Sequence, residues 1–583
     1  MEKALPENRN AQARHSLAAW QRQKPLDYLQ ADPNLQNILE MYMGEAFHRH
    51  KPMLTKAARL SATRMDDLAK ISNRDENLPL LSRFNNIGIR TEEVVFHPSY
   101  HDLGAEIWRT GVLSVLEESG NEMLSGALTY LIAHNGEAGH VCPVACAAGL
   151  IKLLQKVGTA DQKKRYLPRL LNPDYAQRLH AAQFVTEVQG GSDVALNSCV
   201  AEPDDDHEGM YRVSGEKWFC SVIDAGLYVV TARPGGASQG TKGLALFLVP
   251  REINGEVNAF AIRRLKYKLG TRSLASAEVD FIGALAEPIG PIEDGFANLM
   301  GIVLDTSRVY NAVAACGLMR RACIEAQSYA QHRVAFGRPI IEHPGVASIL
   351  ARMNILTTAA VSTTFRILSM NDQLAKGRMT DEQIKARRTQ VNINKYWTAV
   401  QCSQVVHDAI EVLGGNGTIE EFSVLPRLYR DAIVLESWEG THNTLCAQVL
   451  RDFSTRNMHL PWLAELQSVL SAIRHPELAE HRSRVARELE EVSALITHLL
   501  SGEADCASFR VRYVVDRMCV LNSYLSLLAE LDWELGENIV SGKGRIVDLF
   551  YHQYVGQAGA IYMEDDELLV MNRAVCRPII SSG

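Results

Sequence analysis

The sequence lacks the signatures of several large protein classes. Its eleven cysteines form no C-x-x-C pair and show no spacing typical of disulfide-rich domains, which favours a reducing compartment. No uninterrupted apolar run is long enough to cross a membrane, and the first residues, MEKALPENRNAQARHSL, contain no apolar core of a signal peptide. No G-x-G-x-x-G follows a predicted strand, so a Rossmann dinucleotide site is not expected. These absences predict a soluble, cytoplasmic protein without a membrane span.

Positive charge is also scarce. The 60 Lys and Arg residues are outnumbered by 68 Asp and Glu residues, for a formal net charge of −8. From Pro461 onward eleven basic residues stand against eighteen acidic ones, a balance of −7. The arginines of this region are interleaved with glutamates: Arg482, Arg484 and Arg487 with Glu480, Glu488, Glu490 and Glu491. Because DNA affinity depends on clustered cations, DNA is not an expected partner.

The length and the helical spacing of apolar residues predict several domains, most of them helical. Residues 1–101 comprise a polar arm, up to about residue 35, followed by helices. Residues 102–178 form a helical domain, and residues 456–583 form an additional one at the other end of the chain. Within the first of these domains the expected helices are 111–118, 122–133 and 143–157.

Two different periodicities divide the middle of the chain. Residues 179–291 contain short apolar runs of strand length separated by Gly, Pro, Asn and Asp, which predicts an antiparallel β-barrel or sandwich. Residues 292–455 contain long helical segments whose lengths are typical of a four-helix bundle, namely 300–332, 344–374, 381–413 and 443–453. The predicted fold class is therefore α+β, mainly α.

Two histidines in the stretch FHPSYH, Phe96–His101, suggest a metal site. However, no third ligand stands nearby at metal spacing, so a packed turn is the better interpretation. No metal is expected elsewhere in the chain.

The stretch Tyr429–Leu445, YRDAIVLESWEGTHNTL, is typical of a loop that opens into a helix. Gly440 and Thr441 are suited to turn and cap the chain, and a helix N-terminus leaves backbone N–H groups free. A carboxylate just before them, Glu439, could act on a ligand while those groups hold a polarised oxygen. Taken alone, Glu439 could equally be a favourable charge at a helix start.

Five further motifs occur along the chain in a fixed order. They are TEVQGGSDV at 186–194, GEKWFCS at 215–221, RVAFG at 333–337, LGGNG at 413–417 and YRD at 429–431. Together with WEGT at 438–441 they resemble the acyl-CoA dehydrogenase family of flavoproteins, over residues 100 to 455. The motifs FHPSYH, TEVQGGSDV and PRLYRD resemble the AidB branch in particular. The resemblance implies an N-terminal helical domain, a central β domain and a C-terminal four-helix bundle.

The implied chemistry is removal of two hydrogens from an acyl-CoA thioester. The α-proton needs a positioned base, the thioester oxygen needs hydrogen-bond donors, and the β-hydride needs a cofactor as acceptor. The resemblance implies that FAD is this cofactor and that Glu439 is the base, whose pKa rises on burial. A second position used for the base in the family is Ser307 here, which cannot serve as a carboxylate. The residues implied to bind substrate are Ser192, Asp305, Arg308 and Gly440.

The resemblance also implies which residues hold the flavin. Phe219 and Ser221 stand where many members have Trp and Thr, so that ring stacking and a hydroxyl donor are both retained. Gly191 permits close approach of the pyrophosphate. The full implied set in and beside the β domain is Gln183, Val185, Thr186, Gly191, Ser192, Phe219, Cys220, Ser221, Trp438, Thr441 and Asn443.

A third group matches residues that reach the FAD of a neighbouring subunit. Arg333, Phe336, Gly414 and Gly415 belong to it, and a homo-oligomer, a tetramer, is therefore implied. Glu411 stands where the family often has Gln, and a carboxylate beside a pyrophosphate would be repulsive.

Three functions follow from these residues. The first is an acyl-CoA dehydrogenase that forms trans-2-enoyl-CoA, favours straight medium- or long-chain acyl groups and passes electrons to electron-transfer flavoprotein. The second is an AidB-like alkylation-response flavoprotein with a DNA-associated role, against which the acidic C-terminal region argues. The third is an FAD-containing protein that binds and sequesters acyl-CoA without turnover. Chain length and branching of the acyl group are not determined by these patterns.

Overall fold

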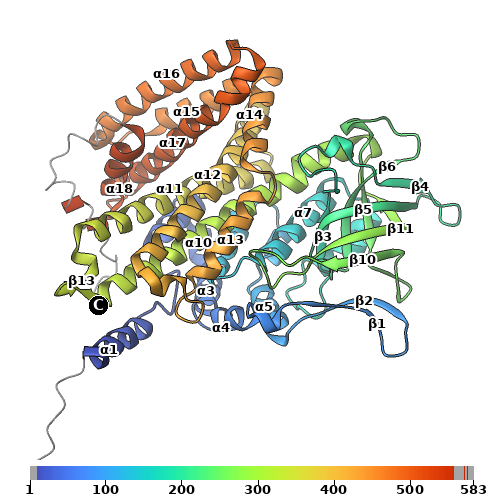
Figure 1. Cartoon of the computed structure of the whole chain (residues 1–583). Helices are drawn as coiled ribbons and strands as arrows, with labels where there is room; N and C mark the ends of the chain where they lie inside the picture. The colour runs from blue at the N-terminus through green and yellow to red at the C-terminus, as the bar shows by residue number, and fades with distance from the viewer. Residues whose placement is uncertain (1–8, 557–569, 572–573, 576–583) are drawn as a thin grey trace, which may run out of the picture.

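Helices make up most of the molecule, and a β domain lies at one end of it. The structure, a computed structural model, describes residues 9–556, 570–571 and 574–575. Outside the described residues lie the first eight residues of the predicted arm and residues 557–569, 572–573 and 576–583 of the predicted C-terminal domain. In Figure 1 the β domain is on the right, the long helices are central, and the orange and red helices of the C-terminal region cover the upper left.

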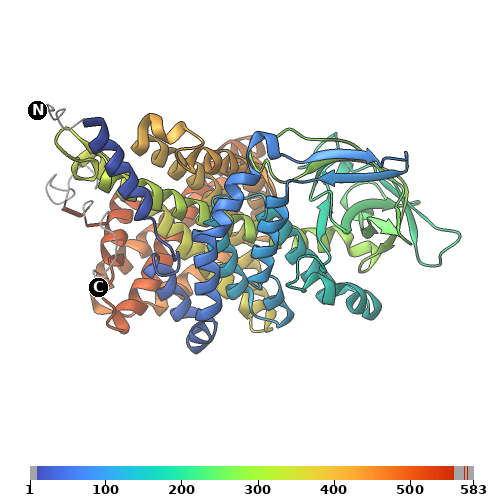
Figure 2. The same cartoon turned by 90° about the horizontal axis from the view of Figure 1, so that it is seen from below.

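The N-terminal region contains more structure than the sequence pattern predicted. Its predicted arm includes a helix whose Trp20 is fully buried and stacks on Phe422 at 5.3 Å between ring centroids. The elements of this region are α1 (Arg9–Arg22), α2 (Pro33–Met43), α3 (Glu45–Ala62), α4 (Arg64–Ser72), β1 (Leu80–Phe84), β2 (Arg90–Val95), α5 (Pro98–Arg109), α6 (Glu122–Ala133), α7 (Val141–Val157) and α8 (Ala160–Leu170). Seen from below, the N-terminal helices lie across the bundle and the β1–β2 hairpin extends along the β domain (Figure 2).

In this region one hairpin was missed and one predicted helix was wrong. The hairpin β1–β2 was not predicted, and it is fastened to the β domain because the backbone N–H of Ile262 donates to Glu92 Oε2 at 2.9 Å. The helix predicted over 111–118 is only a short 3₁₀ turn, Ser114–Glu117. Gly111 has φ 81° and Gly120 has φ 88°, so the chain leaves helical geometry on both sides of this turn.

The β domain is a seven-stranded sheet whose pairs close into a ring. Its strands are β3 (Ala181–Phe184), β4 (Val200–Pro203), β5 (Tyr211–Ser221), β6 (Leu227–Pro234), β7 (Ala245–Pro250), β10 (Phe260–Leu265) and β11 (Ser276–Pro288), with a small hairpin of β8 (Glu252–Ile253) and β9 (Glu256–Val257). The long strand β11 pairs with β5 and β7, and the ring continues through β6 and β4 back to β5. The predicted antiparallel arrangement is incomplete, because β3 and β4 both run parallel to β6.

A bundle of long helices forms the centre. It comprises α10 (Leu304–His332), α11 (Pro344–Ala375), α12 (Asp381–Leu413) and α13 (Leu425–Ser437); the short α9 (Gly295–Asn298) and a π-turn (Leu299–Val303) lead into α10, and the β12–β13 hairpin (Val334–Ala335, Arg338–Pro339) follows it. A capping box between Thr380 and Gln383 starts α12. The predicted fourth member, 443–453, belongs to α14 (His442–Arg456), which packs on α12 and α17 (Ala504–Gly536), whereas α13 packs on α10 and α12.

The C-terminal helices are α15 (His459–Ala472), α16 (Ala479–Ser501), α17 and α18 (Lys543–Phe550). Buried polar contacts attach α17 to α11: Arg366 donates to Asn522 Oδ1 at 2.6 Å, and Ser362 donates to Glu530 Oε2 at 2.7 Å. Among the described residues, α11 is the one helix long and apolar enough to cross a membrane, yet 72% of its apolar window is buried inside the protein. It is therefore a core helix of the bundle.

Candidate active site

Glu439 lies in the short turn between α13 and α14. Trp438 ends α13, Thr441 precedes α14, and the turn needs φ 58° at Glu439 and φ 110° at Gly440. A positive φ at a non-glycine residue is uncommon and is held only where the surroundings impose it. Thr441 occupies the predicted capping position but makes no side-chain capping bond; its hydroxyl instead bonds Thr444 Oγ1 at 2.9 Å.

Two cationic side chains of the bundle hold this turn. Arg308 of α10 donates from Nε to the backbone oxygen of Glu439 at 3.1 Å. Lys395 of α12 donates from Nζ to the backbone oxygens of Gly440 at 2.8 Å and Glu436 at 2.9 Å. Charge-assisted hydrogen bonds of this kind contribute about 1.5–3 kcal/mol each, which is enough to maintain an unfavourable φ. Lys395 was not predicted, because nothing in the helical pattern around it marks a site.

Among the described residues, the Glu439 carboxylate has a single hydrogen-bond donor, which is neutral. Gln183 of β3 donates from Nε2 to Glu439 Oε1 at 3.1 Å and lies 3.0 Å from Ser307 Oγ. The Gln183 amide therefore donates to both positions that the resemblance gives for the base, Glu439 and Ser307. Among the described residues, no cation lies within 4 Å of this carboxylate.

The environment makes Glu439 more basic. Burial raises its pKa from the ordinary value to about 6, although the charges of Arg308 and Lys395 act in the opposite direction. Burial also lowers the pKa of the Lys395 ammonium to about 7. In the described part of the chain the backbone N–H of Glu439 has no hydrogen-bond partner. A base and a free donor thus stand on the same residue.

Helix α7 and the π-turn lie behind the carboxylate. An added Cβ at Gly149 of α7 would lie 3.6 Å from the Val303 backbone oxygen and 3.8 Å from Gln183 Oε1, so α7 packs at ordinary contact distance against the π-turn and β3. One turn earlier, Cys142 and Cys146 lie on the same face of α7 with their sulfurs 4.0 Å apart. Small and apolar groups line this wall, and the sequence pattern did not single them out.

Strand β5 of the β domain presents an aromatic ring and a hydroxyl group on one face. Phe219 at the end of β5 is 54% exposed, and Lys266 Nζ lies 4.8 Å from its ring centroid. Ser221 Oγ is 2.8 Å from Ser276 Oγ of β11. Cys220 between them points into the domain core and is fully buried.

The glycine motif before β4 joins the β domain to α14. A Cβ on Gly191 would lie 2.8 Å from Thr186 Oγ1, so only glycine allows the backbone to pass so close. Ser192 Oγ bonds Thr444 Oγ1 at 3.0 Å, which places this motif beside the first turn of α14. Asn443 is exposed on the same turn, while the Val185 backbone oxygen is taken by Asn197 Nδ2 at 2.8 Å.

Comparison with known proteins agrees with this arrangement. Family models match residues 21–177 (adaptive response protein AidB, N-terminal domain), 182–283 (acyl-CoA dehydrogenase, middle domain) and 293–453 (acyl-CoA dehydrogenase, C-terminal domain). The putative acyl-CoA dehydrogenase AidB of Escherichia coli K12 is 32% identical over 449 residues, covering 74% of this chain and 80% of the relative. The chain belongs to the acyl-CoA dehydrogenase family.

Further relatives resemble this acyl-CoA dehydrogenase over most of its length. Acyl-CoA dehydrogenase family member 11 of Caenorhabditis elegans is 30% identical over 481 residues, covering 80% of this chain and 77% of the relative. The solved structure of Caenorhabditis elegans ACDH-11 in complex with C11-CoA has a TM-score of 0.82 at 26% identity and covers 93% of this chain and 94% of that one. The enzyme class is therefore acyl-CoA dehydrogenase, and FAD is the cofactor of the family.

The residues of this acyl-CoA dehydrogenase fit FAD. The exposed Phe219 ring offers a surface for a planar ring system. Thr186 lies beside the same strand, because its backbone oxygen accepts the Trp218 N–H at 2.9 Å, and Ser221 ends that strand. The backbone at Gly190–Gly191, which carries no side chains, allows close approach of a diphosphate. An aromatic face, hydroxyl donors and bare backbone are the groups that bind a flavin dinucleotide.

Two predicted substrate residues lie on α10 with different partners. Asp305 accepts both guanidinium nitrogens of Arg387, at 3.1 and 2.6 Å, so its charge is already compensated. Arg308 donates from Nη1 to Asn392 Oδ1 at 2.7 Å, in addition to its bond with the Glu439 turn. The structure thus connects Arg308 directly to the candidate base and leaves Asp305 one turn away in an ion pair.

The remaining predicted residues form a second cluster at the far end of α10. Arg333, Gly414, Gly415 and Glu411 line a hollow of about 620 Å³, and Phe336 beyond it is 97% exposed with φ 51°. Arg308 and Arg333 are 25 residues apart on one helix, which corresponds to about 38 Å. One flavin cannot contact both clusters of a single chain.

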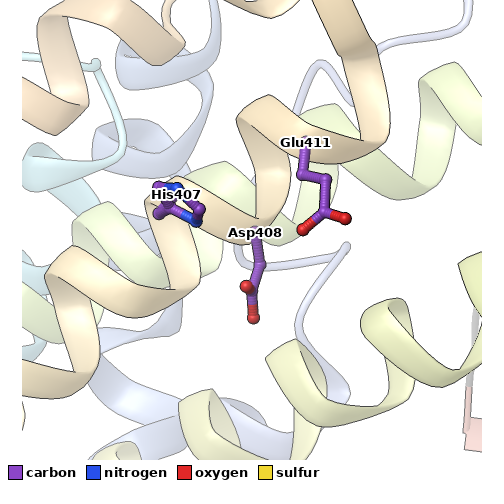
Figure 3. A group of neighbouring side chains, drawn as sticks. All are labelled: His407, Asp408 and Glu411. Carbon is purple, nitrogen blue, oxygen red and sulfur yellow. The ribbon is translucent and has the colours of Figure 1, made fainter.

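One group of possible metal ligands occurs among the described residues: His407, Asp408 and Glu411 on α12 (Figure 3). Both oxygens of Asp408 are engaged by Arg352, at 2.9 and 2.8 Å, so this group is committed to an ion pair. In the FHPSYH motif, the predicted packed turn is confirmed: His97 caps α5, its Nδ1 accepts the Ser99 N–H at 3.2 Å, and Phe96 stacks on Tyr100.

Proposed function

We propose that this enzyme dehydrogenates straight medium- or long-chain acyl-CoA to trans-2-enoyl-CoA with Glu439 as the α-proton base. The observation that carries the proposal is the environment of the Glu439 carboxylate. It is half-buried, is bonded among the described residues only to the neutral Gln183 amide, and has a pKa raised to about 6. A carboxylate in this state accepts a proton readily at neutral pH, whereas one paired with a cation does not.

Glu439 and the residues around it have separate roles in the reaction. Glu439 takes the α-proton, and its own free N–H donates to the thioester oxygen as negative charge develops there. Arg308 and Lys395 hold the turn so that carboxylate and N–H remain on the same side. FAD, when bound along Phe219 and Ser221, supplies the acceptor for the β-hydride.

Support for a longer acyl chain comes from the wall behind Glu439. It consists of Gly149 and the two cysteines of α7 and of the apolar π-turn, so its groups are small and apolar, as an acyl chain requires. The related ACDH-11 was solved with C11-CoA, at a TM-score of 0.82 to this chain. A short or branched acyl group is the alternative that the titration below distinguishes.

A shared cofactor is part of the same proposal. The hollow at Arg333, Gly414 and Gly415 lies about 38 Å along α10 from the catalytic turn, so these residues would contact the FAD of a second subunit. We therefore expect a homo-oligomer, a tetramer, with electron-transfer flavoprotein as the electron acceptor.

A DNA-associated role is not proposed, because the C-terminal region is acidic and several of its arginines are already paired. Arg484 forms an ion pair with Glu480, and Arg517 forms one with Glu488 and with Glu491 at 3.3 Å. Paired arginines within an acidic region offer little attraction to phosphates.

The test is a visible absorption spectrum of the purified protein, followed by anaerobic titration with acyl-CoAs of graded length and branching. We expect an oxidised flavin spectrum that is bleached by straight medium or long chains. Bleaching by short branched chains alone would overturn the substrate assignment. A flavin spectrum that no acyl-CoA bleaches would overturn the catalytic assignment and favour acyl-CoA sequestration.

A further inference from the structure

A lysine stands behind the hydroxyl that faces the flavin site. Lys268 lies in the loop between β10 and β11, and its Nζ donates to the Leu274 backbone oxygen at 2.8 Å and to Ser276 Oγ at 2.9 Å. Ser276 Oγ in turn lies 2.8 Å from Ser221 Oγ. The three polar groups therefore form a chain that starts at an ammonium and ends at the edge of the β domain.

Lys268 differs from the other lysine of this loop. Lys266 Nζ is 2.7 Å from the buried carboxylate of Glu278, so its charge is compensated. Among the described residues, no carboxylate lies within 4 Å of Lys268; the charges that act on its pKa are those of Cys142, Asp431 and Glu137. Its side chain is half-buried. A desolvated, uncompensated ammonium is costly, and such groups are commonly kept where they act on a ligand.

The ammonium decides the direction of the hydroxyl chain. An ammonium only donates, so Ser276 Oγ must accept from Lys268. A hydroxyl whose oxygen is bonded to a cation is a better donor and a poorer acceptor, because hydrogen bonds in a chain polarise one another. Ser276 then donates to Ser221, and the Ser221 proton remains free for a third group.

We propose that Lys268 is a positioning residue that, through Ser276, orients the Ser221 hydroxyl as a hydrogen-bond donor to the flavin. Lys268 has this role only under the proposed function, in which Ser221 contacts FAD. A donor backed by a positive charge favours the reduced, electron-rich flavin over the oxidised one, so the chain raises the reduction midpoint potential of the bound cofactor.

The test is the midpoint potential of the FAD-bound protein, measured by equilibration with redox dyes under a chemical reductant and without acyl-CoA. For Lys268→Met we expect at least a tenfold loss of preference for the reduced flavin, which is a shift of about 30 mV to more negative potential for a two-electron couple. Lys268→Arg should retain most of the wild-type potential. Lys242→Met, which removes an exposed lysine of the same domain, should leave the potential unchanged.

Ser276→Ala breaks the chain without removing a charge and carries the test if Lys268→Met fails to retain FAD. It should shift the potential in the same direction. The double variant should shift it by less than the sum of the two, because both changes interrupt one chain. A wild-type potential in both single variants, or full additivity in the double variant, would overturn the proposal. A flavin that no acyl-CoA reduces would instead count against the proposed function and leave these potentials measurable.

Discussion

Two glutamates near the flavin edge of the β domain are held in opposite ways. Glu187 is buried and accepts from Lys217 Nζ at 2.8 Å; its further donors are the Ser198 N–H and hydroxyl, the Cys199 N–H and the Gln189 amide. The pKa of Glu187 is lowered to about 2, chiefly by Lys217, against the effect of burial. Within the described ranges the Glu439 carboxylate accepts only from the Gln183 amide, and its pKa is raised to about 6. The first carboxylate is fixed as a structural anion, whereas the second is left able to take a proton.

The largest effect is expected from removing the candidate base. In Glu439→Gln the rate of flavin reduction by acyl-CoA should fall by about 10⁴-fold, the upper range for general-base catalysis, while acyl-CoA still binds. Stopped-flow absorbance measures the rate. Glu436→Gln is the matched control, since it removes the same charge one turn earlier from a side chain bonded to Ser403 and His442. An unchanged rate of flavin reduction in Glu439→Gln would show that Glu439 is not the base, and its contrast with Glu187 would then have no catalytic meaning.

The second prediction concerns the structural anion. Lys217→Met should lower the free energy of unfolding by about 3–5 kcal/mol at pH 7, because it leaves the buried Glu187 charge without its cation. Chemical denaturation measures this loss. The double variant Lys217→Met/Glu187→Leu should recover most of it. Arg484→Met, which breaks the more exposed pair with Glu480, should cost less than about 1 kcal/mol.

The third prediction uses the raised pKa of Glu439. The base must be deprotonated to act, so kcat/KM should fall about tenfold per pH unit below pH 6 and level off above it. Glu187, whose pKa is about 2, does not titrate in this range. Initial rates with an artificial electron acceptor between pH 5 and pH 8 give the profile. A flat profile would show that Glu439 is not the titrating base.

The smallest effect is on stability. The pKa of Glu439 is higher in the folded protein than its ordinary value of 4.5, so its contribution to stability is full below pH 4.5 and is lost as pH rises through about 6. At pH 8 Glu439→Gln should therefore raise the free energy of unfolding by about 2 kcal/mol. Glu187→Gln should lower it at the same pH, since a lowered pKa contributes stability above the ordinary value. If Glu439→Gln and Glu187→Gln changed the free energy of unfolding in the same direction at pH 8, the contrast between the two glutamates would be contradicted.

Much of the fold follows from local periodicity. The helices α10, α11 and α12 lie close to their predicted ranges 300–332, 344–374 and 381–413, because the 3.6-residue period persists over enough residues to be read. The hairpin β1–β2 was not predicted, since its tip carries exposed Phe84, Ile87 and Ile89 instead of a buried alternating face. The parallel pairing of β3 and β4 with β6 leaves no trace in the alternation of side chains.

Sequence by itself determined the family and pointed to Glu439, because ordered motifs and the turn residues around Gly440 are local features. Only the tertiary structure decided how that glutamate behaves. Gln183 is 256 residues away in the chain, and its amide is the one donor to the carboxylate that the described part of the chain supplies. Lys395 holds the turn from a helix whose pattern gives no hint of it. The acidity of a side chain depends on its solvation and on charges within a few ångströms, and these neighbours are assembled only by packing.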